Sequence, residues 1–311
     1  MQRKVVIAGG AGFLGQAVAR DLTSRGWTVI VLGRASTPPP VGDLVLWDGK
    51  TLGPWETALE GAEAVINLAG QNIATVHNDE NRKLILDSRI DSVRAMGAAI
   101  RHRARPPRLW LQASATGIYG NSGDRICDES AMEGGALREV EPHPETFLTG
   151  VTRMWEAAFA AEASPARKIA LRTGIVLGRS GGALPPLVKL TKAFLGGSAG
   201  DGRQYISWIH SADYCAFCRW ALESPDAAGT YNVCAPEPAT NADFMRELRH
   251  ALHRPWSPPA PAWAVKFGAE AIMRADASLI LTGQRARPRR LEEAGFAFAF
   301  PRLPAALRDL V

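Results

Sequence analysis

Residues 4–15 read KVVIAGGAGFLG, an apolar run that ends in a glycine-rich turn. The run predicts a buried β-strand, and the turn predicts a helix that starts near Phe13. Gly9, Gly12 and Gly15 would let backbone amides come close to a pyrophosphate. Phe13 and Leu14 would open the helix, whose N-terminus adds free N–H groups and a positive dipole. The stretch therefore predicts a dinucleotide-binding site.

Outward from this turn, apolar runs alternate with helical patterns. The runs are TVIVLGR, AEAVINLAG, RLWLQASAT and RKIALRTGIVLG. Strands this apolar are covered on both faces, so we predict an α/β fold with a Rossmann-type, doubly wound parallel sheet. Beyond about residue 175, Gly and Pro punctuate the segments. We therefore predict a nucleotide-binding domain over 1–175, with strand and helix returns from about 203–234. Residues 176–311 would mainly form a smaller C-terminal α/β region for a substrate or partner.

Composition limits the class of protein. The chain has 311 residues, of which 46% are hydrophobic and 22% charged. It contains no run of about eighteen apolar residues and no signal-peptide pattern, so we expect a cytoplasmic protein with no membrane partner. Its four cysteines are too few for a disulfide scaffold. Cys215 and Cys218 form a CxxC on an apolar helical pattern, and we expect them to be buried and to bind no metal.

The net charge is +5, and arginines bunch at 101–105 and 285–290. A basic surface can attract phosphate or nucleic acid. Neither cluster interleaves aromatic residues or matches a nucleic-acid-binding motif, so we interpret both as solvated faces and expect no nucleic-acid partner.

The end of the second strand indicates which cofactor would bind. NAD-binding folds usually carry an Asp or Glu there, about 20 residues past the glycines, for the ribose 2′-hydroxyl. This chain has Gly33-Arg34-Ala35-Ser36 instead. A carboxylate would repel a 2′-phosphate, whereas Arg34 can pair with it through two hydrogen bonds. We therefore predict NADP as the cofactor, with Gly33 and Arg34 at its 2′-phosphate; the alternative is an exposed surface arginine.

Taken together, several motifs resemble one family. They are GGAGFLG, LGR, VINLAGQNIA, a helix carrying Ser88-Arg89, SATGIYG, the WE of RMWEAAF, LRTGIVLG, GDGRQYISWIHSAD, GTYNVCAPEPATNADF and a late GFAF. The chain is similar over 4–307 to the extended short-chain dehydrogenases. Within them it resembles the NADP-binding "epimerase family" branch, which is sometimes labelled cell-division inhibitor-like and whose reaction is largely unassigned. The resemblance implies NADP and a small-molecule substrate of unknown identity, with a homodimer among the possible assemblies.

The resemblance also implies roles for individual residues. Leu68, Ala69 and Gly70 would end a strand where the family's backbone passes the adenosine and pyrophosphate. Arg89 would be a cofactor-contacting arginine, with a surface salt bridge as the alternative. Ser114 would hydrogen-bond the substrate oxygen, although counting back from Tyr119-Gly120 places Ala115 at that position.

The family's proton-transfer pair has no counterpart in ETFLTGVTRMWE, residues 145–156. Most members carry Tyr-x-x-x-Lys here. Aligning on Glu156, or on Pro144, places Leu148 at the Tyr position and Thr152 at the Lys position; a slip of one residue gives 147 and 151. We therefore predict that this pair is absent. Glu156 lies four residues beyond Thr152, on the same helical face, and could accept the ribose hydroxyls.

Two main hypotheses follow. The first is an NADP-dependent oxidoreductase or epimerase-like enzyme that uses an unconventional acid, with Ser114 and Tyr119 as catalytic candidates. A bare tyrosine has a pKa of about 10, so Tyr119 would need a further perturbation. The second is a non-catalytic NADP-binding protein with a regulatory or partner-binding role. Weaker candidates are His210, which could be structural, and Asp201 and Arg203 in a Gly-rich loop.

Overall fold

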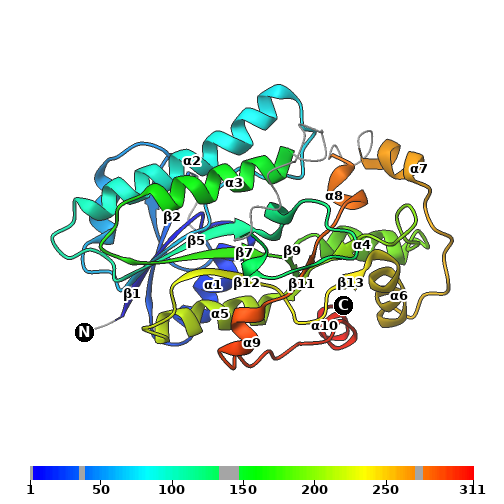
Figure 1. Cartoon of the computed structure of the whole chain (residues 1–311). Coiled ribbons are helices and arrows are strands. Elements are labelled where there is room, and N and C mark those ends of the chain that lie inside the picture. Colours follow the sequence, from blue (N-terminus) through cyan, green and yellow to red (C-terminus); the bar gives the residue numbers. More distant parts are fainter. Residues whose placement is uncertain (1–2, 35–38, 133–146, 270–275) are drawn as a thin grey trace.

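The computed structural model describes residues 3–34, 39–132, 147–269 and 276–311. Its centre is a seven-stranded sheet in the order β12-β7-β5-β4-β1-β2-β3 (Figure 1). Every neighbouring pair in this sheet is parallel. The strands are β1 (Lys4–Ala8), β2 (Thr28–Gly33), β3 (Asp43–Leu46), β4 (Ala64–Asn67), β5 (Leu109–Ala115), β7 (Arg167–Thr173) and β12 (Gly229–Val233). The predicted Rossmann-type, doubly wound parallel sheet is confirmed.

Helices cover both faces of the sheet, as Figure 1 shows. The helices α1 (Phe13–Thr23) and α5 (Ser211–Glu223) lie on one face, and α2 (Asp79–Arg101) and α3 (Phe147–Ala161) lie on the other. Alternate residues of β1 point to opposite faces of the sheet. Val5 and Ile7 belong to the hydrophobic core under α1 and α5, while Val6 and Ala8 belong to the core under α2 and α3. A strand buried on both faces has no polar side, which is why these runs are continuously apolar.

The second region is built from short elements. Three small sheets join β8 (Ile175–Gly178), β9 (Gly181–Gly182) and β11 (Trp208–His210); β10 (Tyr205–Ile206) and β13 (Ala239–Thr240); and β6 (Ile126–Cys127) and β14 (Arg285–Ala286). The helices are α4 (Leu184–Lys192), α6 (Asn241–Ala251), α7 (Ala262–Phe267), α8 (Ser278–Leu281), α9 (Arg289–Glu293) and α10 (Leu303–Leu310). Short 3₁₀ helices span Pro54–Leu59 (η1), Thr116–Tyr119 (η2) and Glu129–Met132 (η3).

A separate hydrophobic core joins α4, α6 and α10 beneath β8 and β11, with Leu184, Leu248 and Leu307 among its buried residues. In contrast, two elements that follow residue 175 belong to the nucleotide-binding fold. The strand β12 is an edge strand of the seven-stranded sheet, and α5 packs on the same face of that sheet as α1. The exact division of the chain at residue 175 stays a prediction. Across the described ranges, no helix combines the length and the apolar character that a membrane crossing needs.

Candidate functional site

The glycine-rich turn between β1 and α1 is packed too tightly for side chains. Gly9 has φ +71°, and a Cβ there would lie 2.8 Å from the carbonyl oxygen of Leu68. A Cβ on Gly15 would lie 2.4 Å from Gly10 Cα. Only glycine allows this conformation at Gly9 and this approach of α1 to the turn. The turn thus rests directly against the segment that follows β4.

The N-terminus of α1 carries donors that no side chain caps. Gly12 is the N-cap and makes no side-chain cap hydrogen bond. A Cβ on Gly12 would meet only the Gly9 carbonyl oxygen, at 3.3 Å, so the space beside the turn is open. Helix N-termini with free amides and an open approach are ready-made anion sites. The geometry fits a pyrophosphate.

Phe13 and Leu14 use their side chains for packing. The Phe13 ring lies against glycines of β8 and β9: a Cβ on Gly178 or Gly181 would lie 2.5 or 2.6 Å from it. Leu14 packs against the core that α1 shares with α5. Any contact of these two residues with a cofactor would therefore be through their backbone amides.

The end of β2 lies next to the same turn. A Cβ on Gly33 would lie 3.8 Å from the Cβ of Ala11. Arg34 follows directly and is exposed. Residues 35 and 36, which complete the predicted 2′-phosphate segment, lie outside the described residues. An exposed guanidinium at this position is well placed to meet an anion.

Arg89 reaches the same edge from the middle of α2. A Cβ on Gly70 would lie 3.4 Å from the guanidinium carbon of Arg89. Arg89 Nη1 donates to the carbonyl oxygens of Gln71 at 3.1 Å and Ile85 at 2.8 Å, and the guanidinium lies 5.0 Å from the Trp155 ring centre. Burial lowers the pKa of Arg89 to about 10.

No acidic residue offsets that shift of the pKa. Within the described part of the chain, Arg89 forms no ion pair with a carboxylate. A partly buried cation without a carboxylate partner is electrostatically costly. We call the Gly9–Gly15 turn, Gly33-Arg34, Leu68–Gly70 and Arg89 the cofactor edge.

A second polar group lies along the carboxyl ends of three adjacent strands. Ser114 of β5 pairs in register with Arg172 of β7, which pairs with Asn232 of β12. Glu156 of α3 lies above this row. Its Oε1 accepts from Ser114 Oγ at 2.5 Å and Arg172 Nε at 2.9 Å, and its Oε2 accepts from Arg172 Nη2 at 2.8 Å. Although burial opposes the change, hydrogen bonds and the charge of Glu156 raise the pKa of Arg172.

These contacts give Glu156 partners within the chain, and its contact with the cofactor ribose stays a prediction. The sequence predicted that its carboxylate holds the ribose of the cofactor. In the structure, Arg172 and Ser114 occupy both carboxylate oxygens. The helical-face argument located Glu156 properly along α3, but it could not show that an arginine from β7 faces the same point.

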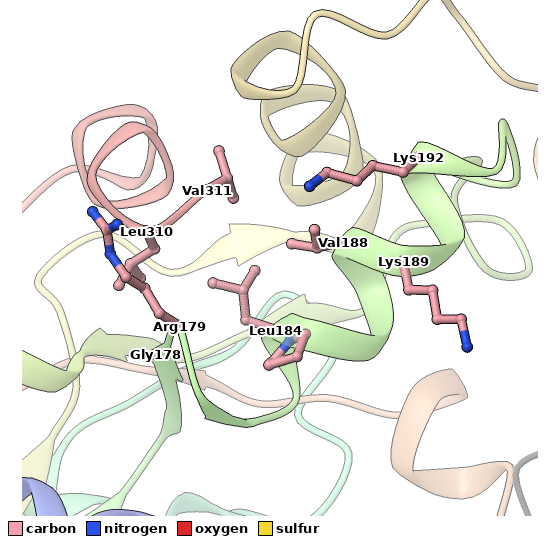
Figure 2. Close-up of a pocket in the computed structure, with 9 residues that line it drawn as sticks. Gly178, Arg179, Leu184, Val188, Lys189, Lys192, Leu310 and Val311 are labelled. Carbon is pink, nitrogen blue, oxygen red and sulfur yellow. The ribbon is translucent and has the colours of Figure 1, made fainter.

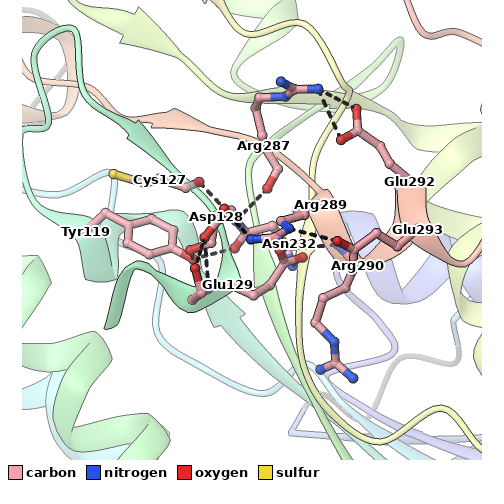
Figure 3. Close-up of polar contacts among 11 residues, drawn as sticks. Tyr119, Cys127, Asp128, Glu129, Asn232, Arg287, Arg289, Arg290, Glu292 and Glu293 are labelled. Carbon is pink, nitrogen blue, oxygen red and sulfur yellow. Dashed lines mark hydrogen bonds and ion pairs between the residues drawn. The ribbon is translucent and has the colours of Figure 1, made fainter. Parts of the chain in front are cut away.

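Tyr119 also belongs to this group (Figure 3). Its hydroxyl lies 2.8 Å from Asn232 Oδ1 and 2.9 Å from the carbonyl oxygen of Asp128, and it accepts from Arg172 Nη1 at 3.0 Å. The side chain is 1% exposed, and burial raises the pKa of Tyr119 further above its usual value. A sealed phenol that holds its proton so firmly is a poor acid. The burial and the contacts of Tyr119 favour a packing role, and its catalytic role stays a prediction.

The remaining polar groups of α3 bond locally. Thr152 Oγ1 donates to the Leu148 carbonyl oxygen at 2.8 Å, one turn earlier in the helix. Thr149 Oγ1 donates to the Gly117 carbonyl oxygen at 3.0 Å, which ties α3 to η2. Pro144, which served to align this helix, lies outside the described residues.

Sequence reasoning missed Arg172 and Asn232. A signal for Arg172 was present, because a charged residue inside the apolar strand RKIALRT is costly unless it is paired. Asn232 donates to the carbonyl oxygens of Cys127 at 3.2 Å and Arg287 at 2.8 Å, which ties β12 to the second region. We call Ser114, Tyr119, Glu156, Arg172 and Asn232 the closed network.

The weaker candidates take structural positions. His210 accepts from the Ala212 amide at 3.0 Å as N-cap of α5, and its ring stacks on Phe300 with centroids 3.9 Å apart. Arg203 lies 3.8 Å from Asp124, and both are exposed. Cys215 and Cys218 are buried in α5. Burial raises the pKa of Cys215 to about 12 and that of Cys218 well above its usual value, as expected of packed thiols.

Residues 5–234 match the NAD dependent epimerase/dehydratase family, and residues 260–310 match a domain of unknown function. The epimerase family protein SDR39U1 of mouse is 34% identical over 99% of both chains. The epimerase family protein YfhF of Bacillus subtilis is 32% identical, over 99% of this chain and 97% of the relative. A crystal structure of human SDR39U1 with NADPH has a TM-score of 0.85 and 31% identity, and the match covers 99% of this chain and 98% of that one.

Proposed function

Because the chain belongs to the NAD-dependent epimerase/dehydratase family of extended short-chain dehydrogenases, we propose that it is an NADP(H)-dependent oxidoreductase or epimerase-like enzyme. Its substrate would be a small polar molecule. The cofactor edge is the observation that carries this proposal, because uncapped amides and two arginines converge where the parallel strands end. The human relative that is solved with NADPH supports the choice of NADP.

Each part of the cofactor edge has a role in this proposal. The amides of Phe13, Leu14 and Gly15 hold the pyrophosphate at the start of α1. Arg34 pairs with the 2′-phosphate, and Gly33 leaves room beside it. The backbone of residues 68–70 runs beside the adenosine, and Arg89 supplies a positive charge next to Gly70. When bound, NADP(H) supplies hydride exchange at its nicotinamide ring.

On the substrate side, the proposal uses Ser114. Its hydroxyl proton points to Glu156 Oε1 at 2.5 Å, so the Ser114 oxygen is left to accept a hydrogen bond from a substrate hydroxyl. As that hydroxyl is oxidised its proton becomes strongly acidic, and it can pass to Ser114 Oγ while the serine proton passes to Glu156. In this proposal Glu156 is the proton acceptor, and Arg172 acts as a positioning residue that holds its carboxylate. This arrangement replaces the Tyr and Lys pair, which we predict to be absent.

The test is turnover with matched binding measurements. Purified protein with NADP⁺ is presented with secondary alcohols and nucleotide-linked sugars, and nicotinamide absorbance reports reduction. We expect Ser114→Ala to abolish any turnover while its NADPH affinity stays within about twofold of wild type. Ser24→Ala, at an exposed serine, is the control. Full turnover in Ser114→Ala would refute the assigned role of Ser114.

A non-catalytic NADP-binding protein is the second candidate. The closed network favours it, because Ser114 already donates to Glu156, and Tyr119 already bonds to Asn232 and Arg172. On this hypothesis NADPH binds tightly, the whole panel gives no reduction, and Ser114→Ala changes only the free energy of unfolding. Transfer of deuterium from labelled NADPH to any of the ketones or keto-sugars that correspond to the panel would exclude this candidate.

A further inference from the structure

The exposed aromatic side chains of the protein gather in two segments of the second region. Phe194, Trp256, Trp263 and Phe267 are 56%, 73%, 75% and 67% exposed. Every other phenylalanine and tryptophan among the described residues is buried or half-buried. Leu195, beside Phe194, is 67% exposed. Exposed apolar groups that cluster in this way mark interaction sites.

The two segments, residues 184–200 and 252–269, lie side by side. Ala199 and Ala260 form an isolated parallel bridge that joins them. Trp263 and Phe267 are four residues apart on α7, so they leave the helix on one face. Figure 1 shows α4 and α7 at the end of the molecule that lies away from the N-terminus. We call Phe194, Leu195, Trp256, Trp263 and Phe267 the aromatic end.

The backbone of Phe194 takes a conformation that is unfavourable for an aromatic residue. Phe194 follows the end of α4 with φ +64°, where helices often place a glycine. The Arg254 guanidinium carbon lies 5.0 Å from the ring centre, yet more than half of the side chain stays exposed. The chain thus keeps an aromatic ring at the surface where glycine would fit the backbone better.

Basic side chains accompany the aromatic end. The two segments contain no aspartate or glutamate, but they contain Lys189, Lys192, Arg254 and Lys266. The three lysines are exposed, and Figure 2 shows Lys189 and Lys192 extending from α4. Protein interfaces are usually poor in lysine, whereas surfaces that bind membranes combine lysine with tryptophan and phenylalanine. A second copy of the chain would also bring like charges together. An anionic lipid surface therefore fits this composition better than a protein partner.

We propose that the aromatic end docks on the surface of a membrane that contains anionic lipids. The aromatic rings and Leu195 would enter the boundary between head groups and acyl chains, and the lysines would meet lipid phosphates. The chain would lie on the membrane without crossing it. The prediction of no membrane partner depends on the absence of a spanning segment, and a surface of this kind is independent of that absence.

Co-sedimentation with lipid vesicles tests the proposal, using the full chain saturated with NADPH. Saturation fills the cofactor edge, so lipid phosphates cannot bind there. Vesicles of equal parts phosphatidylcholine and phosphatidylglycerol are compared with vesicles of phosphatidylcholine alone. We expect saturable binding to the anionic vesicles and binding on the order of tenfold weaker to the neutral ones, because the neutral surface does not attract the lysines.

Two matched pairs of variants separate the aromatic end from the rest of the surface. Leu195→Ala should weaken binding to anionic vesicles about fivefold, whereas Leu46→Ala in β3, at a leucine that is 59% exposed, should leave it unchanged. Lys266→Glu should weaken binding on the order of tenfold, since it replaces attraction by repulsion. Lys50→Glu makes the same change of charge at an exposed lysine after β3, and should change the affinity less than about twofold.

Phe194→Gly separates binding from stability. Glycine adopts the conformation at this position freely, so the midpoint of urea unfolding should stay the same or rise. The affinity for anionic vesicles should nevertheless fall on the order of tenfold, because a ring that would enter the lipid is lost.

The proposal is overturned by any of three results: no binding to anionic vesicles, equal weakening by both members of either pair, or wild-type vesicle affinity in Phe194→Gly. Dimers that Leu195→Ala breaks, in a protein that does not bind vesicles, would assign the aromatic end to a second copy of the chain instead.

Discussion

The closed network and the cofactor edge both form where parallel strands end, yet they treat polar groups in opposite ways. In the closed network, Arg172 meets Glu156 through two hydrogen bonds and Tyr119 through a third. At the cofactor edge, the contacts of Arg89 among the described residues are carbonyl oxygens and the Trp155 ring, and the first amides of α1 have no side-chain cap.

This difference shows in which of the two regions the chain itself supplies the partner for a buried charge. A buried charge is tolerated when its partner comes from the same chain, as at Arg172. At Arg89 the described residues provide no carboxylate, and two carbonyl oxygens and the Trp155 ring partly offset the cost of burial. Mutations in the closed network should therefore change mainly folding, and those at the cofactor edge mainly binding.

The largest effect is expected from Glu156→Ala. It leaves the buried Arg172 without its carboxylate partner, which typically costs about 3–5 kcal/mol in the free energy of unfolding. Urea unfolding measures this loss. Glu293→Ala is the control, because Glu293 pairs with Arg289 in an exposed i,i+4 bridge and should cost less than about 1 kcal/mol. If both variants lose the same free energy of unfolding, the claim that the closed network stabilises the fold through its buried charge pair is wrong.

Arg34→Ala should act on binding instead. Loss of a charge-assisted hydrogen bond to the 2′-phosphate should cost roughly 1.5–3 kcal/mol, or about tenfold or more in NADPH affinity, with NADH affinity unchanged. Titration of both cofactors measures the preference, and Arg25→Ala, an exposed arginine on the far side of α1, is the control. If wild type binds NADPH and NADH equally, the assignment of Arg34 is wrong.

Gly15→Ala tests whether the tight turn itself is required. The new methyl group would lie 2.4 Å from Gly10 Cα, so the turn must shift, at a cost of about 1–3 kcal/mol in folding or in NADPH affinity. Gly150→Ala is the matched control, because an added Cβ there meets nothing within 4 Å and the residue is exposed in α3. It should stabilise the protein by up to about 1 kcal/mol.

The smallest effect concerns pH and Glu129, which borders the closed network. Burial raises its pKa above the usual 4.5, although backbone amides of Asn232 and Arg290 donate to it. Its folded state therefore holds the proton more tightly than its unfolded state. The contribution of Glu129 is largest below about pH 4 and is lost as pH rises through the raised pKa. The stability of wild type relative to Glu129→Gln should fall over that rise; a difference that grows instead would contradict the sign.

The sequence predicted the cofactor edge better than the closed network, and the reason is the range of the interactions. Glycine spacing around Gly9 and Gly15 is local, and the strand before and helix after it are visible in the same fifteen residues. The row of Ser114, Arg172 and Asn232 depends on how three distant strands align, which no local pattern encodes. The burial of Tyr119 could not be predicted for the same reason, since burial is a property of the assembled fold.

The Phe13 ring occupies the space that side chains at residues 178, 181 and 182 would otherwise fill. The Phe13 ring and any side chains on the β8–β9 hairpin would therefore compete for the same space. A substitution on one side requires a compensating change in side-chain size on the other. Across relatives, we expect an aromatic residue at position 13 to occur together with glycine at those three positions. A small residue at position 13 should occur together with alanine or larger residues there. The glycine-rich turn and the second region are linked by this contact, and we expect them to covary.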